Sequence, residues 1–251
     1  MTEQANASGS GAIEGLAEPR LVDAGRGLSW WTEAWPLFTK CAGIWIVMTL
    51  MLIVIFIVLS LIPLVGGLAI SLLLPVFAGG WMLAARKVDA GGNAEIADLF
   101  SGFRDKLSPL LVLGALMLAA SLVITLVAVL LGAGAILGVI TGVALGSGDG
   151  AMAGLGAGML GLLVAVALSL VVTMAIWFAP ALVVLRNVAP VEALKASFAA
   201  CLKNTVPFLV YSVLYLVAAI VASIPFGLGW IVLMPVLMLT LYVSYKDIFG
   251  D

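Results

Sequence analysis

The longest charged interruption between apolar runs of this chain lies between Arg86 and Pro109. Eight charged residues lie there: Arg86, Lys87, Asp89, Glu95, Asp98, Arg104, Asp105 and Lys106. Their signs are mixed, and no acid and base have a spacing suited to paired catalysis. Basic side chains beside an apolar run can instead contact lipid phosphates. The predicted headgroup contacts are Arg86, Lys87, Arg104 and Lys106, and a solvated face with local ion pairs is the alternative.

Most catalytic and metal-binding chemistry lacks its usual residues here. There is no histidine, the commonest general base and metal ligand. Cys41 and Cys201 are far apart and neither has a CxxC partner, so we expect reduced, structural thiols. The net charge of -2 and the scattered basic residues disfavour a nucleic-acid partner. We therefore predict no catalytic, cofactor-binding or metal-binding residues, and no enzymatic activity.

The composition is that of an integral membrane protein. Hydrophobic residues make up 64% of the chain and charged residues 10%, against about 45 to 50% and about 25% in soluble domains. Residues 41–85, 107–185 and 204–245 form three long blocks whose one charged residue is Asp149. Because a helix needs roughly 20 apolar residues to cross the hydrocarbon layer, each block can hold two spans. The predicted fold class is all-α, with six transmembrane helices arranged as three hairpins.

The expected organisation is one membrane domain, residues 28–247, between two short ends. Residues 1–27 are rich in Gly, Ala, Ser and Glu without periodicity, which predicts a disordered tail; residues 248–251 form the other end. All 11 Lys and Arg residues fall in the N-terminal region, after the second and fourth spans, or at the C-terminus. The positive-inside rule therefore places both termini in the cytoplasm. No basic start precedes a short apolar core, so we expect no cleavable signal peptide.

A short amphipathic helix is predicted before each hairpin. Apolar residues recur at helical spacing after residues 28, 96 and 191, with charged residues opposite, a pattern typical of helices in the membrane interface. Indole rings prefer this layer. The expected interfacial anchors in the first of these helices are Trp30, Trp31 and Trp35.

The order of interfacial helix, span, turn and span predicts an internal repeat. Its three units cover residues 28–88, 93–187 and 190–247. Ile62-Pro63-Leu64 in the first unit is matched by Ile224-Pro225-Phe226 in the third, each followed by glycines. The middle unit matches least well.

Glycine recurs at every fourth position from Gly134 to Gly158. On a helix this spacing lets another backbone approach closely. The predicted packing face is formed by Gly134, Gly138, Gly142 and Gly146. Packing within the monomer is the first interpretation; contact between copies or a moving lining are the alternatives. Whether residues 132–161 are helical, re-entrant or a loop stays open, and with it whether Asp149 caps a solvated turn or meets a cation.

Several stretches resemble those of a known family. They are Gly80-Trp81-Met82-Leu83-Ala84-Ala85-Arg86-Lys87, Asp98-Leu99-Phe100-Ser101-Gly102-Phe103, Ala193-Leu194-Lys195-Ala196-Ser197-Phe198 and Lys203-Asn204. Residues 28–247 are similar to the YciC-like six-helix inner-membrane proteins of bacteria, a family without an assigned function. Their pattern is related to the membrane domain of some glycerophosphodiester phosphodiesterases. The resemblance implies a bacterial inner-membrane location and carries over no catalytic residue.

The predicted function is that of a non-enzymatic inner-membrane protein that organises or binds membrane proteins or lipids. Its expected partners are membrane lipids, other membrane proteins or further copies of the chain. The alternative is a transporter or channel for a small solute or lipid. Since the spans contain no Asp, Glu, Lys or Arg, ion-coupled transport is disfavoured.

Overall fold

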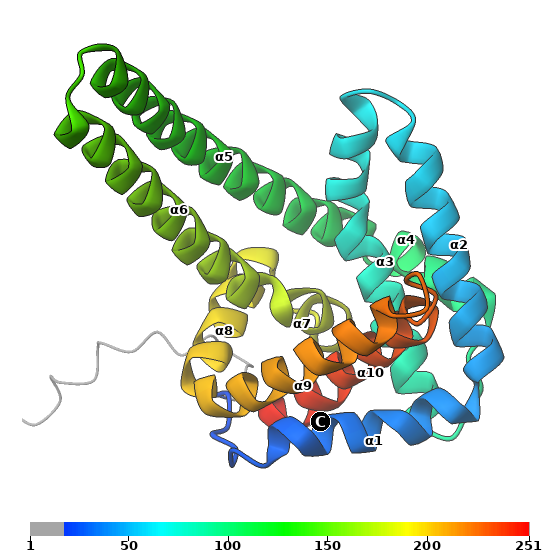
Figure 1. The fold of residues 1–251 in the computed structure, drawn as a ribbon. Coiled ribbons are helices and arrows are strands. Elements are labelled where there is room, and N and C mark those ends of the chain that lie inside the picture. The colour runs from blue at the N-terminus through cyan, green and yellow to red at the C-terminus, as the bar shows by residue number, and fades with distance from the viewer. Residues whose placement is uncertain (1–17, 251) are drawn as a thin grey trace, which may run out of the picture.

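The computed structural model describes residues 18–250, and in this range every regular element is a helix (Figure 1). Six of these helices are long and apolar enough to cross a membrane. In chain order the elements are α1 (Arg26–Lys40), α2 (Ala42–Ser60), α3 (Val65–Asp89), the 3-10 helix η1 (Ile96–Phe100), α4 (Ser101–Asp105), α5 (Leu107–Ala144), α6 (Gly148–Trp177), α7 (Ala179–Arg186), α8 (Pro190–Lys203), α9 (Thr205–Ser223) and α10 (Trp230–Phe249).

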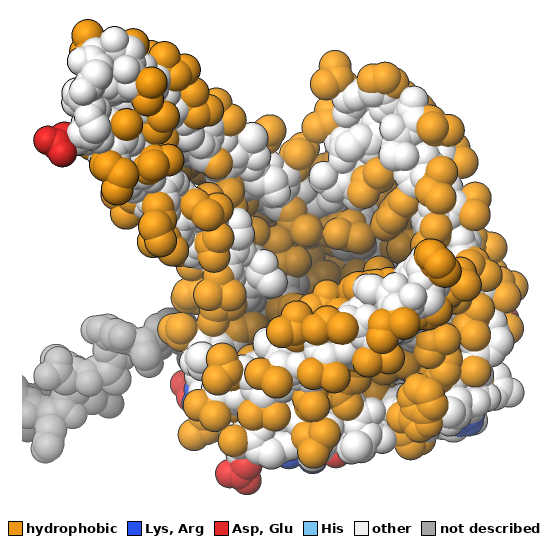
Figure 2. Space-filling model, viewed as in Figure 1, with side chains coloured by type: hydrophobic (Ala, Val, Ile, Leu, Met, Phe, Trp, Pro, Cys, Tyr) orange, Lys and Arg blue, Asp and Glu red, His pale blue; other side chains and the backbone are white. Residues whose placement is uncertain are grey.

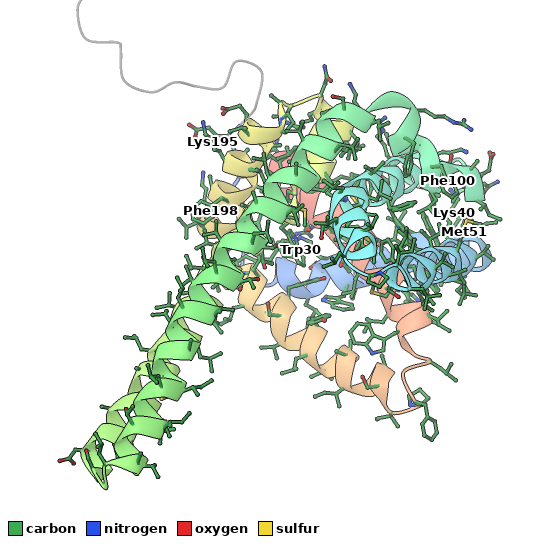
Figure 3. All side chains as sticks on the ribbon, turned by 90° about the horizontal axis from the view of Figure 1, so that it is seen from above. Trp30, Lys40, Met51, Phe100, Lys195 and Phe198 are labelled. Carbon is green, nitrogen blue, oxygen red and sulfur yellow. The ribbon has the colours of Figure 1, made fainter. Side chains whose placement is uncertain are left out.

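Three pairs of consecutive long helices diverge from a common base. The pairs α2–α3, α5–α6 and α9–α10 point away from one another, while α1, α7 and α8 lie at the base (Figures 1 and 3). The core sits where the pairs meet, and its largest fully buried rings are Trp30, Trp45, Phe178, Tyr245 and Phe249. Away from this core, the apolar side chains of α5, α6 and α9 are mostly exposed.

The α5–α6 pair is much longer than two minimal membrane spans. A span needs roughly 20 apolar residues, but α5 has 38 residues and ends at Ala144, and α6 begins at Gly148. The glycine-rich segment is therefore helical on both sides of a short turn at Leu145, Gly146 and Ser147. A helix of this length measures about 57 Å at about 1.5 Å per residue, nearly twice the hydrocarbon thickness of about 30 Å. It fits inside the hydrocarbon only if it is strongly tilted.

The beginning of the chain is more ordered than expected. The disordered tail predicted for residues 1–27 lies outside the described residues as far as residue 17. From residue 18 onward the backbone is fixed: the Arg20 amide donates to the Ile248 carbonyl at 2.7 Å, and the Val22 amide donates to Asn204 Oδ1 at 2.9 Å. The helix α1 then begins at Arg26. The prediction for residues 18–27 was wrong because the partners of this segment lie about 200 residues away in sequence, where local composition gives no signal.

The face that α1 turns to the protein differs from the expected one. Its buried residues are Gly27, Trp30, Ala34 and Phe38, and the Trp30 ring is fully buried. Figure 3 shows Trp30 near the centre of the molecule. The prediction that Trp30 is an interfacial anchor is therefore wrong. The small residues of this face do not stand out as apolar in the sequence, yet they let α1 pack closely, since a Cβ at Gly27 would lie 2.3 Å from the Pro207 carbonyl oxygen.

Candidate functional site

A concave site lies in a groove between α6 and α9. It has a volume of about 520 Å³, and its floor is formed by α10 and one residue of α8. In Figure 2 the hollow between the diverging pairs is lined with hydrophobic side chains. The apolar side chains of the groove are Met174, Phe208, Leu209, Leu237, Met238 and Leu241.

Several hydroxyl groups also line the groove, and most of them have a hydrogen-bond partner within the protein. Thr173, Thr205 and Ser212 each donate to a carbonyl of their own helix or its preceding turn, at 2.7 to 2.8 Å. Tyr211 shares a hydrogen bond of 3.0 Å with Thr240. Tyr215 also lines the groove, but within the described residues its hydroxyl has no hydrogen-bond partner.

The end of α6 is shaped by a side chain from α8. Phe178 would normally donate its amide to the Met174 carbonyl, four residues earlier. Instead, the Phe178 amide donates to Ser197 Oγ at 2.9 Å, and this hydroxyl donates to the Met174 carbonyl at 2.8 Å. A hydroxyl inserted into the helical ladder bends the helix, and Pro180 follows at the start of α7. Ser197 is fully buried, so this insertion fixes the last turn of α6 and with it Trp177.

Trp177 is the residue of the groove with the most unusual environment. Its indole Nε1 is buried and has no hydrogen-bond partner among the described residues. Its ring lies nearly perpendicular to those of Phe208 and Tyr211, with centroids 5.9 and 5.8 Å away. Trp177 does not stand out in the sequence, because an isolated tryptophan at the end of a span has the pattern of an ordinary interface anchor.

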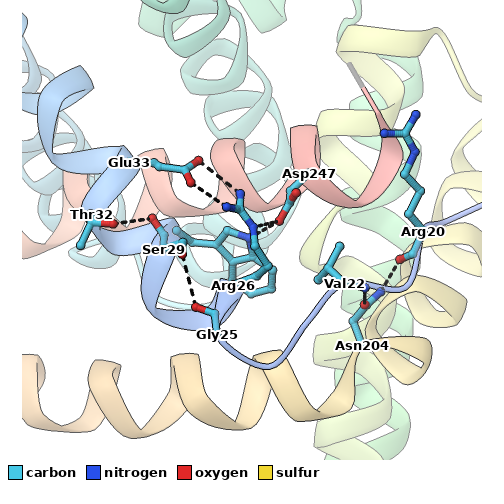
Figure 4. A network of polar contacts seen from close by, with 10 residues as sticks. Arg20, Val22, Gly25, Arg26, Ser29, Thr32, Glu33, Asn204 and Asp247 are labelled. Carbon is cyan, nitrogen blue, oxygen red and sulfur yellow. Dashed lines mark hydrogen bonds and ion pairs between the residues drawn. The ribbon is translucent and has the colours of Figure 1, made fainter.

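A second site, which is polar, joins α1 to α10 at the base (Figure 4). Asp247 Oδ2 accepts from Arg26 Nε at 2.6 Å and from Trp30 Nε1 at 2.9 Å, while Arg26 Nη1 pairs with Glu33 at 2.8 Å. The hydrogen bond to Asp247, followed by that to Glu33, outweighs desolvation and raises the pKa of the Arg26 guanidinium above its ordinary value. This cluster keeps the charge of Arg26 and fixes the position of α1.

Asn204 binds the segment before α1, at Arg20 and Val22, to the same region. This side chain is fully buried; its amide nitrogen donates to the carbonyls of Arg20 and Ala200 at 2.9 and 3.0 Å, and its oxygen accepts from Val22. Nearby, Tyr242 and Lys246 of α10 both donate to Asp89 at the end of α3. We call these contacts of Asp247, Asn204 and Asp89 the clasp. Its charged side chains pair with one another, and its role is structural.

Comparison with known proteins identifies the family of this chain. A family model described as a domain of unknown function (DUF7847) matches residues 37–244. The chain belongs to the DUF7847 family. A probable inner membrane protein of Burkholderia thailandensis is similar to it, with 28% identity over 252 residues that cover 91% of this chain and 93% of the relative. No solved structure matches the chain.

The DUF7847 region contains the whole groove but only part of the clasp. All groove residues lie between Thr173 and Leu241, inside the matched range, whereas Arg26, Trp30 and Asp247 lie outside it. The groove is therefore built from the part of the chain that the family model describes, while the clasp depends on flanking residues.

The basic side chains predicted to contact lipid phosphates divide into two groups in this DUF7847 member. Lys87 pairs with Glu95 at 2.9 Å and Asp98 at 3.1 Å, and Lys106 donates to Asn187. Arg86 and Arg104 are exposed, and neither guanidinium makes a hydrogen bond or ion pair with the side chains and backbone that the structure describes. Headgroup contact stays a prediction for all four, and the two arginines are the ones whose donors are not already engaged.

The glycines predicted to pack together also divide. A Cβ at Gly138 would lie 3.1 Å from Gly154 Cα, and one at Gly142 would lie 2.2 Å from the Ala151 nitrogen, so both face α6 closely. A Cβ at Gly134 would meet no atom within 4 Å, and Gly146 lies in the turn with φ +66°. The expected four-residue face is therefore reduced to two positions, because the chain reverses at Gly146 and α5 faces open space at Gly134.

The cysteines lie apart, as two free thiols. Cys201 lines the groove at its α8 side, and burial raises the pKa of this thiol to about 12. A thiol in this state is a poor nucleophile. Within the described residues, no three His, Cys, Asp or Glu side chains form a group that could hold a metal ion.

Proposed function

We propose that this chain is a non-enzymatic integral membrane protein that binds membrane lipids in the groove between α6 and α9. The observation that carries the proposal is the groove itself, about 520 Å³ of mostly apolar space on helices that qualify as membrane spans. Ligand sites usually measure about 300 to 1,000 Å³. Water finds too few hydrogen-bonding partners in an apolar hollow to occupy it, whereas acyl chains gain dispersion contacts there.

The membrane setting is part of the proposal. The similar protein of Burkholderia thailandensis is described as a probable inner membrane protein, which supports a bacterial inner-membrane location for this chain. The distribution of Lys and Arg supports cytoplasmic termini, with each pair of long helices crossing as a hairpin and the helices of the base lying in the cytoplasmic interface. The likeness to YciC-like proteins belongs to the same proposal.

Lipid binding is tested by native mass spectrometry of the protein purified in mild detergent. We expect the wild-type protein to retain phospholipid. Leu209→Trp adds volume inside the groove and should remove most of the retained lipid. Leu216→Trp is the matched control, since it changes the same residue type on the same helix, at a position that is 59% exposed and outside the groove.

The proposal predicts that Leu216→Trp retains lipid as the wild type does. Unchanged melting temperatures for both variants would show that the difference is one of binding. A wild-type protein without bound lipid, or equal retention by both variants, would contradict lipid binding in the groove. Solute leak through vesicles that is abolished by Leu209→Trp would instead favour the channel alternative.

A further inference from the structure

The groove between α6 and α9 occupies only the part of these long helices that lies next to the base. On α6 it is lined by the last turn, from Thr173 to Trp177, which leads directly into α7 at the base. On α9 the lining begins at Thr205, the first residue of the helix, and ends at Tyr215. One end of the groove therefore lies at the base, and the other lies midway along α9.

The length of the groove matches one leaflet of a bilayer. At about 1.5 Å per residue, the stretch from Thr205 to Tyr215 measures about 15 Å and all of α9 about 28 Å. The hydrocarbon layer is about 30 Å thick, so α9 is just long enough to cross it, and the groove covers the half nearer the base. An acyl chain that enters from this leaflet can follow the groove along its whole length.

Charge is absent from the groove and present at its base end. Among the described residues that line it, none is Asp, Glu, Lys or Arg, whereas Figure 2 shows charged side chains gathered at the base. A phosphate inside the groove would lose its hydration without gaining a counter-charge. A phospholipid in the groove must therefore keep its headgroup at the base and extend its chain towards Tyr215.

Lys203 supplies a positive charge at this end of the groove. It lies at the corner between α8 and α9, between Cys201 and Thr205 of the groove lining. Its ammonium donates to the Pro19 carbonyl at 2.8 Å, and no carboxylate of the described residues pairs with it. The carbonyl holds the side chain without neutralising it, and an ammonium has three donors, so two remain for a phosphate. By contrast, Lys195 of the same helix is paired with a carboxylate at 3.0 Å.

We infer that the groove binds an acyl chain of an anionic phospholipid from the leaflet on the side of the base, with the phosphate at Lys203 and the chain running along α9 towards Tyr215. With cytoplasmic termini, this is the cytoplasmic leaflet. The inference rests on the proposed lipid binding and adds the charge of the headgroup, the leaflet and the direction of the chain.

The direction of the chain is tested with two photoreactive phosphatidylglycerols in vesicles. One carries a diazirine near the ester end of an acyl chain, and the other carries it near the methyl end. Peptide mass spectrometry should find adducts of the ester-end probe at Thr205 and Phe208, and adducts of the methyl-end probe at Ser212 and Tyr215. The reverse order, or the same residues labelled by both probes, would overturn the inference. A groove labelled by neither probe would instead contradict the proposed lipid binding.

The charge of the headgroup is tested by native mass spectrometry. The delipidated protein is titrated with phosphatidylglycerol, which is anionic, and with phosphatidylcholine of identical chains, which is zwitterionic. The wild type should bind phosphatidylglycerol about 5-fold more tightly, the effect of one basic side chain beside an anionic lipid. Lys203→Gln keeps a hydrogen-bond donor but removes the charge, so it should abolish most of this preference.

The matched control is Lys195→Gln, because it removes one positive charge from an exposed position of the same helix where that charge is already paired. This variant should keep the wild-type preference. Equal binding of the two lipids by the wild type, or an equal loss of preference in both variants, would overturn the inference while leaving lipid binding intact. If neither lipid binds the wild type, the proposed function itself fails.

Discussion

Leu64 occupies a backbone conformation that is unfavourable for a leucine. Its φ is +64° and its ψ is -56°, in a γ-turn where the Val65 amide donates to the Pro63 carbonyl at 2.7 Å. Only glycine adopts positive φ freely, and a bulky residue there costs about 1 to 3 kcal/mol. The side chain offers little in return from the protein, since it is 88% exposed.

Leu64→Gly should therefore leave the free energy of unfolding unchanged or raise it by up to about 1 kcal/mol. Thermal unfolding in detergent measures this change. Leu61→Gly is the control on the same turn: Leu61 is 75% exposed, but its φ of -71° suits any L-residue. That change should be neutral or destabilising. A loss of stability in Leu64→Gly larger than in Leu61→Gly would show that the Leu64 side chain is held by contacts with its surroundings.

Cys201 should resist alkylation in the folded protein. It is 4% exposed, and burial raises the pKa of its thiol from 9.0 to about 12. The raised value means that the protonated thiol contributes stability below about pH 9, and that this contribution is lost as the pH rises towards 12. At pH 8, N-ethylmaleimide should modify half-buried Cys41 first and Cys201 only after unfolding in dodecyl sulfate. Equal rates in the folded protein would contradict the burial of Cys201.

Single residues were the least predictable feature of the chain. The core face of α1 was missed because Gly27 and Ala34 allow close packing but add little apolar surface. Ser197 and Trp177 were missed because their roles depend on contact between α8 and the end of α6, which no local pattern reveals. By contrast, the sequence alone shows that the chain has no His and that its two cysteines are far apart.

At the scale of elements, the contact between α5 and α6 depends on particular glycines. A Cβ at Gly142 would lie 2.2 Å from backbone nitrogen of Ala151, so Gly142→Ala should force the helices apart and destabilise the monomer by about 1 to 3 kcal/mol. Gly134→Ala is the matched control on the same helix. It meets open space and should be neutral or stabilising by up to about 1 kcal/mol, since alanine favours a helix.

Thermal unfolding with size-exclusion chromatography measures both effects. If Gly134→Ala dissolved an oligomer while the monomer stayed folded, Gly134 would instead face another copy of the chain. Equal tolerance at both positions would contradict the close α5–α6 contact.

Long apolar elements were predictable, but the boundaries inside the glycine-rich segment were not. The first span, Ala42–Ser60, and the fifth, Thr205–Ser223, lie within the uncharged blocks 41–85 and 204–245. Between residues 132 and 161, glycine is compatible with helix, turn and re-entrant loop alike. The helix is settled there by packing between α5 and α6, and the turn by the positive φ of Gly146 together with Ser147 Oγ, which accepts from the Gly150 amide.

A non-glycine residue with positive φ occurs at matching positions of two turns in the chain. Leu64 and Phe226 each follow the proline of an Ile-Pro pair, each has positive φ, and both side chains are highly exposed. This likeness supports the proposed internal repeat of the first and third units. The repeat itself stays a prediction, since the middle pair turns instead at Gly146.

For the whole molecule, composition and length were enough to predict six apolar helices. They could not predict that the three pairs diverge and leave a groove (Figure 2), because this depends on which buried rings and glycines meet at the base. The amphipathic patterns were read as lipid-facing, whereas α1 is fastened to α10 through Asp247. The groove follows from tertiary packing that sequence periodicity does not encode.

The membrane orientation gives a test at the same scale. Reporter fusions at Gly91, in the loop after α3, and at the C-terminus should both report the cytoplasm, while a fusion at Gly148, at the tip of the α5–α6 pair, should report the periplasm. The charged side chains in Figure 2 gather at the base, apart from an acidic one at that tip, where Asp149 lies in the first turn of α6. A periplasmic signal at Gly91 would contradict six spans with cytoplasmic termini.

The central claim is that lipid occupies the groove between α6 and α9, and photolabelling in vesicles measures this most directly. A phospholipid with a diazirine midway along one acyl chain is added at trace level, and the adducts are mapped by peptide mass spectrometry. We predict an excess of adducts on the groove residues of α9 and α10, including Leu209 and Met238, that Leu209→Trp removes. Adducts spread over the exposed faces of α2, α5, α6 and α9 in proportion to their area, with no excess in the groove, would contradict the claim.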